Sequence, residues 1–451
     1  MQSLNYRQSL EYIYSFSDYE TIHKLHDPAS YDLRRVFELM SLLGDPHLKA
    51  KTVHIAGTKG KGSVAAMIAS VLTASGYKTG LYTSPHLIDI RERFQIDGEM
   101  VSEAEFTDII NEIKPSVDAV NRRATYGLLT TFEVMTALCF VFFARHNADF
   151  CVVEVGLGGR LDATNIVSPE VCIITPVNLD HTDVLGDTIA KIAAEKAGII
   201  KQAIPVVSAP QVDEAMQVIE EKCLAQHSPL IKVGTDILWQ DECSTPEKSR
   251  LVIRGRLNNY RLSVPLAGCC QWENAATAIA ALEVLTGKGF NISLLSISKG
   301  MSEVKWPGRF QLMGRNPLII IDGAHNVLSA RQLKKSLQYH YKQYFSKSDS
   351  QPACSTILIF GASADKDVGS MIGELAALFD EIIVTRSQHP RSMKVSLLKE
   401  EFLKQGRAVH EAEDVPKAIE LARRQAPNNA LICITGSLFV AGDAILYFNN
   451  G

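Results

Sequence analysis

Three glycines, a lysine and a serine lie close together in the stretch GTKGKGS, residues 57–63. An apolar run, KTVHIA (51–56), precedes it, and a run of helical composition follows from Ser63. Glycines let several backbone amides converge, while the ammonium group of Lys61, the hydroxyl of Ser63 and a helix N-terminus all attract an anion. The pattern predicts a loop that binds nucleotide phosphates, with a glycine-rich structural turn as the alternative.

This loop matches neither of the two common nucleotide-binding motifs. A Walker loop would need glycine at position 55 and a hydroxyl at 62, whereas the chain has Ile55 and Gly62. A dinucleotide motif built on Gly60, Gly62 and Ala65 would need an acidic residue after the next strand, which ends in YTS. We therefore treat it as a third kind of phosphate loop.

Polar residues also follow two later strand-like runs. Glu154 ends the run DFCVVE, where a carboxylate could bind a metal ion beside a nucleotide or cap the next turn. Asp180, His181 and Asp183 follow VCIITPVN, and His181 is either a ligand or a structural hydrogen-bonding group. From the residues alone, both alternatives stay open at both positions.

A lysine lies on the apolar face of the helix expected after Asp187. Ile189, Ile192, Lys196 and Ile199 are spaced by three, four and three residues, so they share one face. Lys196 could extend outward along its methylene groups. It could also turn inward to a charged site, with chemical modification of its amine as a further alternative.

A second group of polar residues follows strand-like runs near the C-terminus. Asp322 and His325 follow LIIID, Asp365 and Lys366 follow STILIFG, and Ser437 follows ALICITG. Each residue alone could cap a turn or a helix. Because the carboxyl ends of parallel strands share one sheet edge, their clustering favours a binding site.

The elements that would position these residues form two α/β domains. The chain has 451 residues, more than one hydrophobic core usually supports. Strands alternate with helices, which predicts a P-loop-type domain with a mostly parallel sheet at 1–302. Four strand-like runs in 228–266 predict an attached antiparallel β patch. A linker is expected at 303–314 and a Rossmann-like α/β domain at 315–451.

The amino-acid composition limits the kinds of molecule that the protein is expected to bind. There are 46 basic and 50 acidic side chains spread along the chain, which gives no electrostatic argument for nucleic acid or membrane. Nine cysteines without a CxxC pair indicate reduced thiols, and the N-terminus does not resemble a signal peptide. The apolar run 131–144 is too short to span a bilayer and predicts a buried helix. We expect a cytoplasmic monomer that binds small molecules.

Seven stretches together resemble a known family. They are, in order, GTKGKGS, TSPHLIDIRERFQIDG, TTFEVMTA, EVGLGGRLDATNIV, LDHTDVLGDTIAKIAAEKAGIIK, WPGRFQ and DGAHN. These stretches resemble the motifs of folylpolyglutamate synthase and dihydrofolate synthase, within the Mur ligase superfamily. The resemblance runs from about residue 40 to the C-terminus, and glycine ahead of Ser63 is similar to the folate branch.

The resemblance implies an ATP- and Mg²⁺-dependent ligase that joins L-glutamate to a folate-type acceptor through an acyl phosphate. The acceptor would be a tetrahydrofolylpolyglutamate, dihydropteroate or both. Such chemistry depends on positioning and charge neutralisation. A phosphotransferase or NTPase using the same loop is the alternative from another class, and a binding protein without catalysis is a third.

The resemblance also assigns roles to particular residues. Lys61, Lys196 and His325 would act in catalysis, with Lys196 as a carbamate. The residues expected to contact ATP are Gly57, Thr58, Lys59, Gly60, Lys61, Gly62, Ser63, Asn274, Arg309 and Asp322. The residues expected to bind Mg²⁺ are Ser84, Glu154 and His181. Ser437 would lie on the glutamate side, and Cys270 stands where the family usually has histidine.

Overall fold

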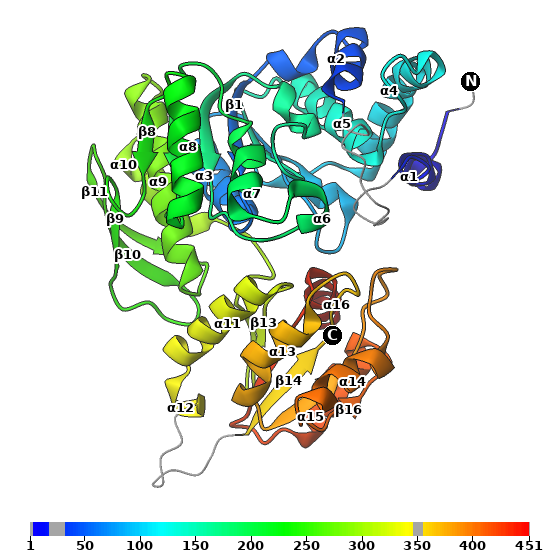
Figure 1. Ribbon diagram of the computed structural model, residues 1–451, viewed down its shortest axis with the longest axis vertical. Coiled ribbons are helices and arrows are strands. Elements are labelled where there is room, and N and C mark those ends of the chain that lie inside the picture. The colour runs from blue at the N-terminus through cyan, green and yellow to red at the C-terminus, as the bar shows by residue number, and fades with distance from the viewer. Residues whose placement is uncertain (1–2, 18–31, 346–354, 451) are drawn as a thin grey trace. The chain divides into compact units, whose positions relative to one another are not determined.

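The computed structural model describes residues 3–17, 32–345 and 355–450. The chain divides into two compact units, which are described separately (Figure 1). The first unit consists of 1–240, 251–263 and 273–304, and the second of 241–250, 264–272 and 305–451. The domain boundaries expected from the sequence, with a linker at 303–314, stay a prediction.

The first unit is built on an eight-stranded sheet of order β4-β3-β2-β5-β1-β6-β7-β8. The six strands from β2 to β8 in that order are parallel, while β3 and β4 add an antiparallel edge. Its strands are β1 (Lys51–Ala56), β2 (Thr79–Tyr82), β3 (Phe94–Ile96), β4 (Glu99–Met100), β5 (Phe150–Glu154), β6 (Pro169–Ile174), β7 (Val206–Ser208) and β8 (Leu230–Lys232). This arrangement confirms the mostly parallel sheet.

Helices connect the strands of the first unit. They are α1 (Tyr6–Tyr14), α2 (Leu33–Leu42), α3 (Lys61–Ala74), α4 (Glu103–Arg123), α5 (Thr131–Arg145), α6 (Thr182–Leu185), α7 (Ile189–Ala197), α8 (Asp213–Ala225), α9 (Cys270–Gly287) and α10 (Leu294–Glu303). The apolar side chains of α5 pack with those of α1, α2 and α4 in one core, which confirms the predicted buried helix. Glu133 is tolerated in α5 because its carboxylate pairs with buried Arg35 at 2.8 Å.

The expected β patch is smaller than predicted. A separate three-stranded sheet contains β9 (Leu238–Asp241), β10 (Ser249–Arg254) and β11 (Asn259–Val264). The run LIKVG was wrongly assigned to it, because β8 instead pairs in parallel with β7 in the large sheet. The run follows α8 and has Ile231 buried, so it continues the βα alternation that precedes it. Short apolar runs do not reveal which sheet they join.

The second unit contains a six-stranded sheet of order β12-β13-β17-β14-β15-β16, in which only β12 is antiparallel to its neighbour. Its strands are β12 (Gln311–Arg315), β13 (Leu318–Ile321), β14 (Thr356–Phe360), β15 (Glu381–Val384), β16 (His410–Glu411) and β17 (Leu431–Thr435). Its helices are α11 (Val327–His340), α12 (Lys342–Phe345), α13 (Val368–Leu375), α14 (Val395–Lys404), α15 (Val415–Gln425) and α16 (Leu438–Asn450). This topology confirms the Rossmann-like α/β fold, and β12 includes the last residues of the expected linker.

The cysteines of the described residues are all free thiols, and most of them are buried. Cys243 is exposed, Cys269 and Cys270 are half-buried, and Cys354 lies outside the described residues. Within 3–17, 32–345 and 355–450, no helix combines the length and the apolar character needed to cross a membrane.

Candidate functional site

The predicted phosphate loop connects β1 to α3, and its glycines allow close approach by neighbouring segments. Gly57 has a φ of +145°, and a Cβ there would lie 1.9 Å from Thr175 Oγ1. Gly60 has a φ of +88° and precedes α3; a Cβ there would lie 2.4 Å from Asn274 Oδ1. The structure therefore places Asn274, from α9, directly against the loop at the start of a helix.

Cys270, the residue that departs from the family pattern, is the first residue of α9. Asn274 lies one turn later on the same helix and still reaches the loop at Gly60. The substitution at position 270 therefore leaves the position of Asn274 intact.

Thr58 fixes the loop to the segment that follows β6. Its backbone amide donates to Pro176 O at 2.9 Å. Its hydroxyl donates to Asn178 O at 3.2 Å and accepts from Asn178 N at 3.1 Å. These bonds hold the backbone between Gly57 and Gly60 in place before any ligand binds.

Lys61, Glu154 and Ser84 come together at the carboxyl ends of β1, β5 and β2. The Nζ atom of Lys61 lies 3.7 Å from Glu154 Oε1, and both side chains are largely buried. The amide of Ser84 donates to Glu154 Oε2 at 3.3 Å. The phosphate-loop lysine, Lys61, and the predicted metal ligand Ser84 thus both contact the predicted metal ligand Glu154.

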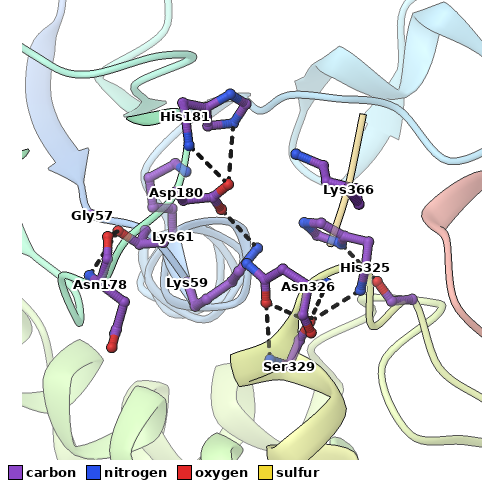
Figure 2. A network of polar contacts seen from close by, with 12 residues as sticks. Gly57, Lys59, Lys61, Asn178, Asp180, His181, His325, Asn326, Ser329 and Lys366 are labelled. Carbon is purple, nitrogen blue, oxygen red and sulfur yellow. Dashed lines mark hydrogen bonds and ion pairs between the residues drawn. The ribbon is translucent and has the colours of Figure 1, made fainter. Parts of the chain in front are cut away.

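His181 lies with Asp180 beside the phosphate loop, to which Lys59 belongs (Figure 2). Lys59 Nζ lies 3.3 Å from Asp180 Oδ2, and the His181 amide donates to Asp180 Oδ1 at 3.1 Å. His181 has a φ of +51° and precedes α6. Asp180 was not among the predicted site residues, although its position in the segment that follows the buried strand β6 was a usable signal.

Lys196 turns inward, so the alternative in which it extends to solvent is wrong. It is 5% exposed, and its Nζ atom donates to Gly57 O at 3.0 Å. Its pKa is lowered to about 7, chiefly by burial and also by the cationic groups of Lys61 and Lys59, while Asp180 opposes the shift. A large share of this amine is therefore neutral near neutral pH, beside the loop backbone.

The oxygen-bearing side chains near the phosphate loop fit Mg²⁺, which takes some of its ligands from water and phosphate. They fit less well a metal bound by protein side chains alone. No three His, Cys, Asp or Glu side chains among the described residues are arranged to hold a metal. Magnesium commonly uses one or two carboxylates and takes its other ligands from water and phosphate. The Glu154 carboxylate supplies hard oxygen donors next to Lys61, and Ser84, whose amide contacts that carboxylate, carries a hydroxyl of the same kind.

In the second unit, Asp322 fixes the end of β13 and the chain around Arg309. Its carboxylate accepts from the amides of Phe310 and Ala324, each at 2.8 Å. Burial raises its pKa, and Arg309 opposes that shift. A Cβ at Gly323 would lie 2.8 Å from an Arg309 guanidinium nitrogen, so Arg309 folds across this glycine.

His325 and Ser437 lie at the same sheet edge as Asp322. The His325 Nδ1 atom lies 2.8 Å from Gly323 O, which can only accept, so Nδ1 carries the proton and Nε2 is the basic nitrogen. The His325 amide donates to Ser329 Oγ at 3.0 Å (Figure 2). Ser437 Oγ accepts from Phe439 N at 3.0 Å, capping α16, and its hydroxyl keeps a proton to donate.

The predicted residues thus form one group in each unit. The first contains the loop from Gly57 to Ser63 with Ser84, Glu154, His181, Lys196 and Asn274. The second contains Arg309, Asp322, His325 and Ser437. Each group lies where parallel strands end, which is the usual ligand position in α/β sheets.

Models of two domain families match the chain. The Mur ligase middle domain matches residues 55–282, and the Mur ligase glutamate ligase domain matches residues 308–438. The middle-domain match includes the phosphate loop, and the glutamate-ligase-domain match includes the six-stranded sheet of the second unit. They define the broad class as that of the Mur ligases.

Individual relatives narrow the class. The chain is 35% identical over 415 residues to the dihydrofolate synthase/folylpolyglutamate synthase of Bacillus subtilis, covering 91% of this chain and 93% of that protein. It resembles a structure of Mycobacterium tuberculosis folylpolyglutamate synthase complexed with ADP and AMPPCP (TM-score 0.84, 33% identity, 92% and 95% coverage). It also resembles E. coli FolC in complex with DHPP and ADP (TM-score 0.85, 27% identity, 99% and 98% coverage). The chain therefore belongs to the folylpolyglutamate synthase and dihydrofolate synthase family of the Mur ligase superfamily.

Proposed function

We propose that this protein is an ATP-dependent ligase that adds L-glutamate to a folate-type acceptor, releasing ADP and phosphate. The observation that carries this proposal is the joint position of Lys61, Glu154 and Ser84 beside a loop whose glycines admit close approach. Relatives in this family bind ADP and AMPPCP, which supports ATP as the nucleotide here.

In the proposed mechanism, the loop amides and Lys61 hold the β- and γ-phosphates of ATP. Ser84, Glu154 and His181 would hold Mg²⁺, which would neutralise charge on the phosphates. The acceptor carboxylate attacks the γ-phosphorus, the bond to the β–γ bridging oxygen breaks, and ADP leaves. The glutamate amine then attacks the acyl carbon, phosphate leaves and the amine proton passes to a base. These steps need positioned charges more than a nucleophilic side chain.

Lys196 is proposed to react with carbon dioxide. Its neutral amine would attack the carbon atom, forming an N–C bond, and a proton would leave to solvent. The lowered pKa supports this step, because only the neutral amine is nucleophilic. The product would place an anion beside Gly57, near the cationic groups of Lys59 and Lys61, where the protein otherwise carries an amine.

We also propose roles for residues of the second unit. Arg309 and Asp322, together with Asn274 of the first unit, would contact ATP. His325 would act in catalysis, and Ser437 would lie on the glutamate side. Their position at the carboxyl edge of the second sheet supports these roles. A cytoplasmic location and a monomeric state stay expectations from the sequence.

The experiment that tests the function offers the purified protein ATP, Mg²⁺, L-glutamate and one acceptor at a time. The acceptors are dihydropteroate and tetrahydrofolate carrying a glutamate tail, and the readouts are ADP release and product mass. A mass gain of one glutamate residue on either acceptor supports the proposal and identifies the acceptor. ADP release without a new amide would instead favour the phosphotransferase or NTPase.

A further inference from the structure

Asp180 is a carboxylate that the proposed mechanism does not use, and it joins two parts of the first unit. Its Oδ2 atom lies 3.3 Å from the Nζ atom of Lys59, in the phosphate loop. Its Oδ1 atom accepts a hydrogen bond from the amide of His181 at 3.1 Å and lies 3.8 Å from Nε2 of that histidine. One carboxylate therefore connects the loop with a residue predicted to bind Mg²⁺ (Figure 2).

The ion pair between Lys59 and Asp180 is sheltered from solvent. Each of its two side chains is 13% exposed. By comparison, the pair between Lys191 and Asp187 in the same unit leaves its side chains 63% and 78% exposed. Charges withdrawn from water attract each other more strongly, because water and salt screen them less. The sheltered pair is therefore able to hold two segments together, whereas an exposed pair contributes little.

The two neighbours of Asp180 in the chain are not held by burial. Leu179 is 55% exposed, and the His181 side chain is 37% exposed. His181 also has a φ of +51°, a left-handed conformation that is unfavourable for residues other than glycine. The position of the imidazole therefore depends on polar contacts such as the one with Asp180.

Backbone and hydroxyl contacts hold the same two segments in register. The hydroxyl of Thr58 donates to Asn178 O at 3.2 Å and accepts from Asn178 N at 3.1 Å. The amides of Thr58 and Lys59 both donate to Pro176 O, at 2.9 and 3.4 Å. These contacts reach Asn178, and the ion pair of Lys59 with Asp180 carries the connection further along the chain.

We propose that Lys59 and Asp180 are a pair of positioning residues that hold His181 at the phosphate loop for the Mg²⁺ that accompanies the nucleotide. This assignment rests on the proposed function, which places ATP and Mg²⁺ at this loop. In this role the ammonium group of Lys59 serves Asp180 instead of a phosphate. Residues that orient a metal ligand without touching the metal typically change metal affinity by about 10- to 100-fold when they are replaced.

Isothermal titration calorimetry on the full-length protein tests the pair by measuring the Kd of ADP, with Mg²⁺ and with EDTA in its place. The variants are Lys59→Gln, Asp180→Asn and the double variant that carries both changes. With Mg²⁺, we expect each single variant to raise the Kd by about 10-fold. The double variant should match the single ones, because both changes break the same connection. With EDTA, all variants should keep the wild-type Kd, which also shows that they are folded.

Two further variants are controls. Lys59→Arg keeps a cation opposite Asp180, so it should stay close to the wild-type Kd in the presence of Mg²⁺. Asp187→Asn removes an exposed carboxylate that pairs with Lys191 at 2.8 Å, and it should leave both Kd values unchanged.

Three results would overturn the assignment. An unchanged Kd in either single variant would show that the pair does not act on the nucleotide site. Losses that multiply in the double variant would show that Lys59 and Asp180 act independently, as expected if Lys59 binds a phosphate itself. Losses of equal size with Mg²⁺ and with EDTA would show that the pair does not serve a metal ligand.

Amide formation, measured separately, distinguishes failure of this assignment from failure of the proposed function. Binding of ADP needs neither acceptor nor glutamate, so it tests the pair independently of the ligase reaction. If the calorimetry gives the expected pattern but wild type forms no amide with either acceptor, the ligase assignment fails and the pair is retained. If wild type forms the amide and Asp180→Asn keeps the wild-type Kd, only the role of the pair fails.

Discussion

Lys196 is a buried cation whose charge state depends on pH near neutrality. Its pKa is about 7 in the folded chain, against an ordinary value of 10.5. Between these two values the unfolded chain binds the proton and the folded chain does not. Unfolding then takes up a proton, so this residue makes stability rise with pH across that interval.

We therefore expect Lys196→Met to be more stable than wild type below about pH 7, with the difference shrinking as the pH approaches 10.5. Denaturant unfolding at several pH values, in buffers free of carbon dioxide, measures this difference. The matched control is Lys191→Met on the same helix, where the exposed ammonium group pairs with Asp187 at 2.8 Å. A constant difference between Lys196→Met and wild type would contradict the account.

Single residues were partly predictable from the sequence. The periodicity of α7 placed Lys196 on an apolar face, but it could not choose between an inward and an outward side chain. The amine turns inward because Gly57 O accepts its proton, a contact between segments far apart in the chain. The contact of Asn274 with Gly60 also joins segments far apart in the chain, so the sequence pattern could not predict it.

At the scale of elements, the junction between β1 and α3 depends on the absence of a side chain at Gly60. Gly60 and Gly76 lie at opposite ends of α3 and have φ values of +88° and +89°. A Cβ at Gly60 would lie 2.4 Å from Asn274 Oδ1, whereas a Cβ at Gly76 has no atom within 4 Å. The two positions therefore carry the same backbone strain and differ in the steric conflict.

Both alanine variants should lose about 1 kcal/mol of stability from the left-handed backbone. Only Gly60→Ala should also lower kcat/KM for ATP, by about 100-fold, because the loop must shift away from Asn274. Thermal unfolding and steady-state kinetics on both variants measure the two effects. Equal activity of Gly60→Ala and Gly76→Ala would show that the contact with Asn274 does not position the loop.

The turn between β10 and β11 is held by one buried carboxylate from α9. Glu283 accepts from the amides of Arg256, Leu257 and Asn258 at 2.8, 2.9 and 3.2 Å. It also accepts from the Tyr260 hydroxyl at 2.9 Å. We expect Glu283→Gln to cost about 2 to 4 kcal/mol, because the new amide nitrogen would face N–H groups that need an acceptor.

Chemical denaturation measures this cost against Glu303→Gln, an exposed carboxylate at the end of α10. The control should stay close to the wild-type stability. If both variants unfold at the same denaturant concentration, the Glu283 carboxylate does not stabilise the turn.

Most elements of the sheets followed from alternating apolar and helical runs. The strand β8 was misassigned, and the short antiparallel strands β3 and β4 were missed. Residues Phe94–Ile96 and Glu99–Met100 are too short to show a period of their own, and they become strands through pairing with β2 and with each other. Strand order within a sheet depends on such tertiary contacts, so it was not predictable from local pattern.

For the whole molecule, the restart of βα alternation near Leu318 was sufficient to predict a second α/β unit. Each unit places its polar residues at the carboxyl ends of parallel strands, which the sequence predicted from residues such as Glu154 and Asp322. Balanced charge and dispersed basic residues agreed with small-molecule substrates. The expectation of glutamate ligation to a folate-type acceptor came only from the seven stretches that resemble the folylpolyglutamate synthase and dihydrofolate synthase family.

The central claim is that ATP turnover is coupled to formation of an amide with glutamate. ADP release is measured with all substrates present, and then with glutamate or the acceptor omitted in turn. We predict one amide formed per ADP with the complete mixture, little sustained ADP release without either substrate, and loss of both products in Lys61→Ala. ADP release that continues at the same rate without glutamate and acceptor would contradict the assignment of this protein as a ligase.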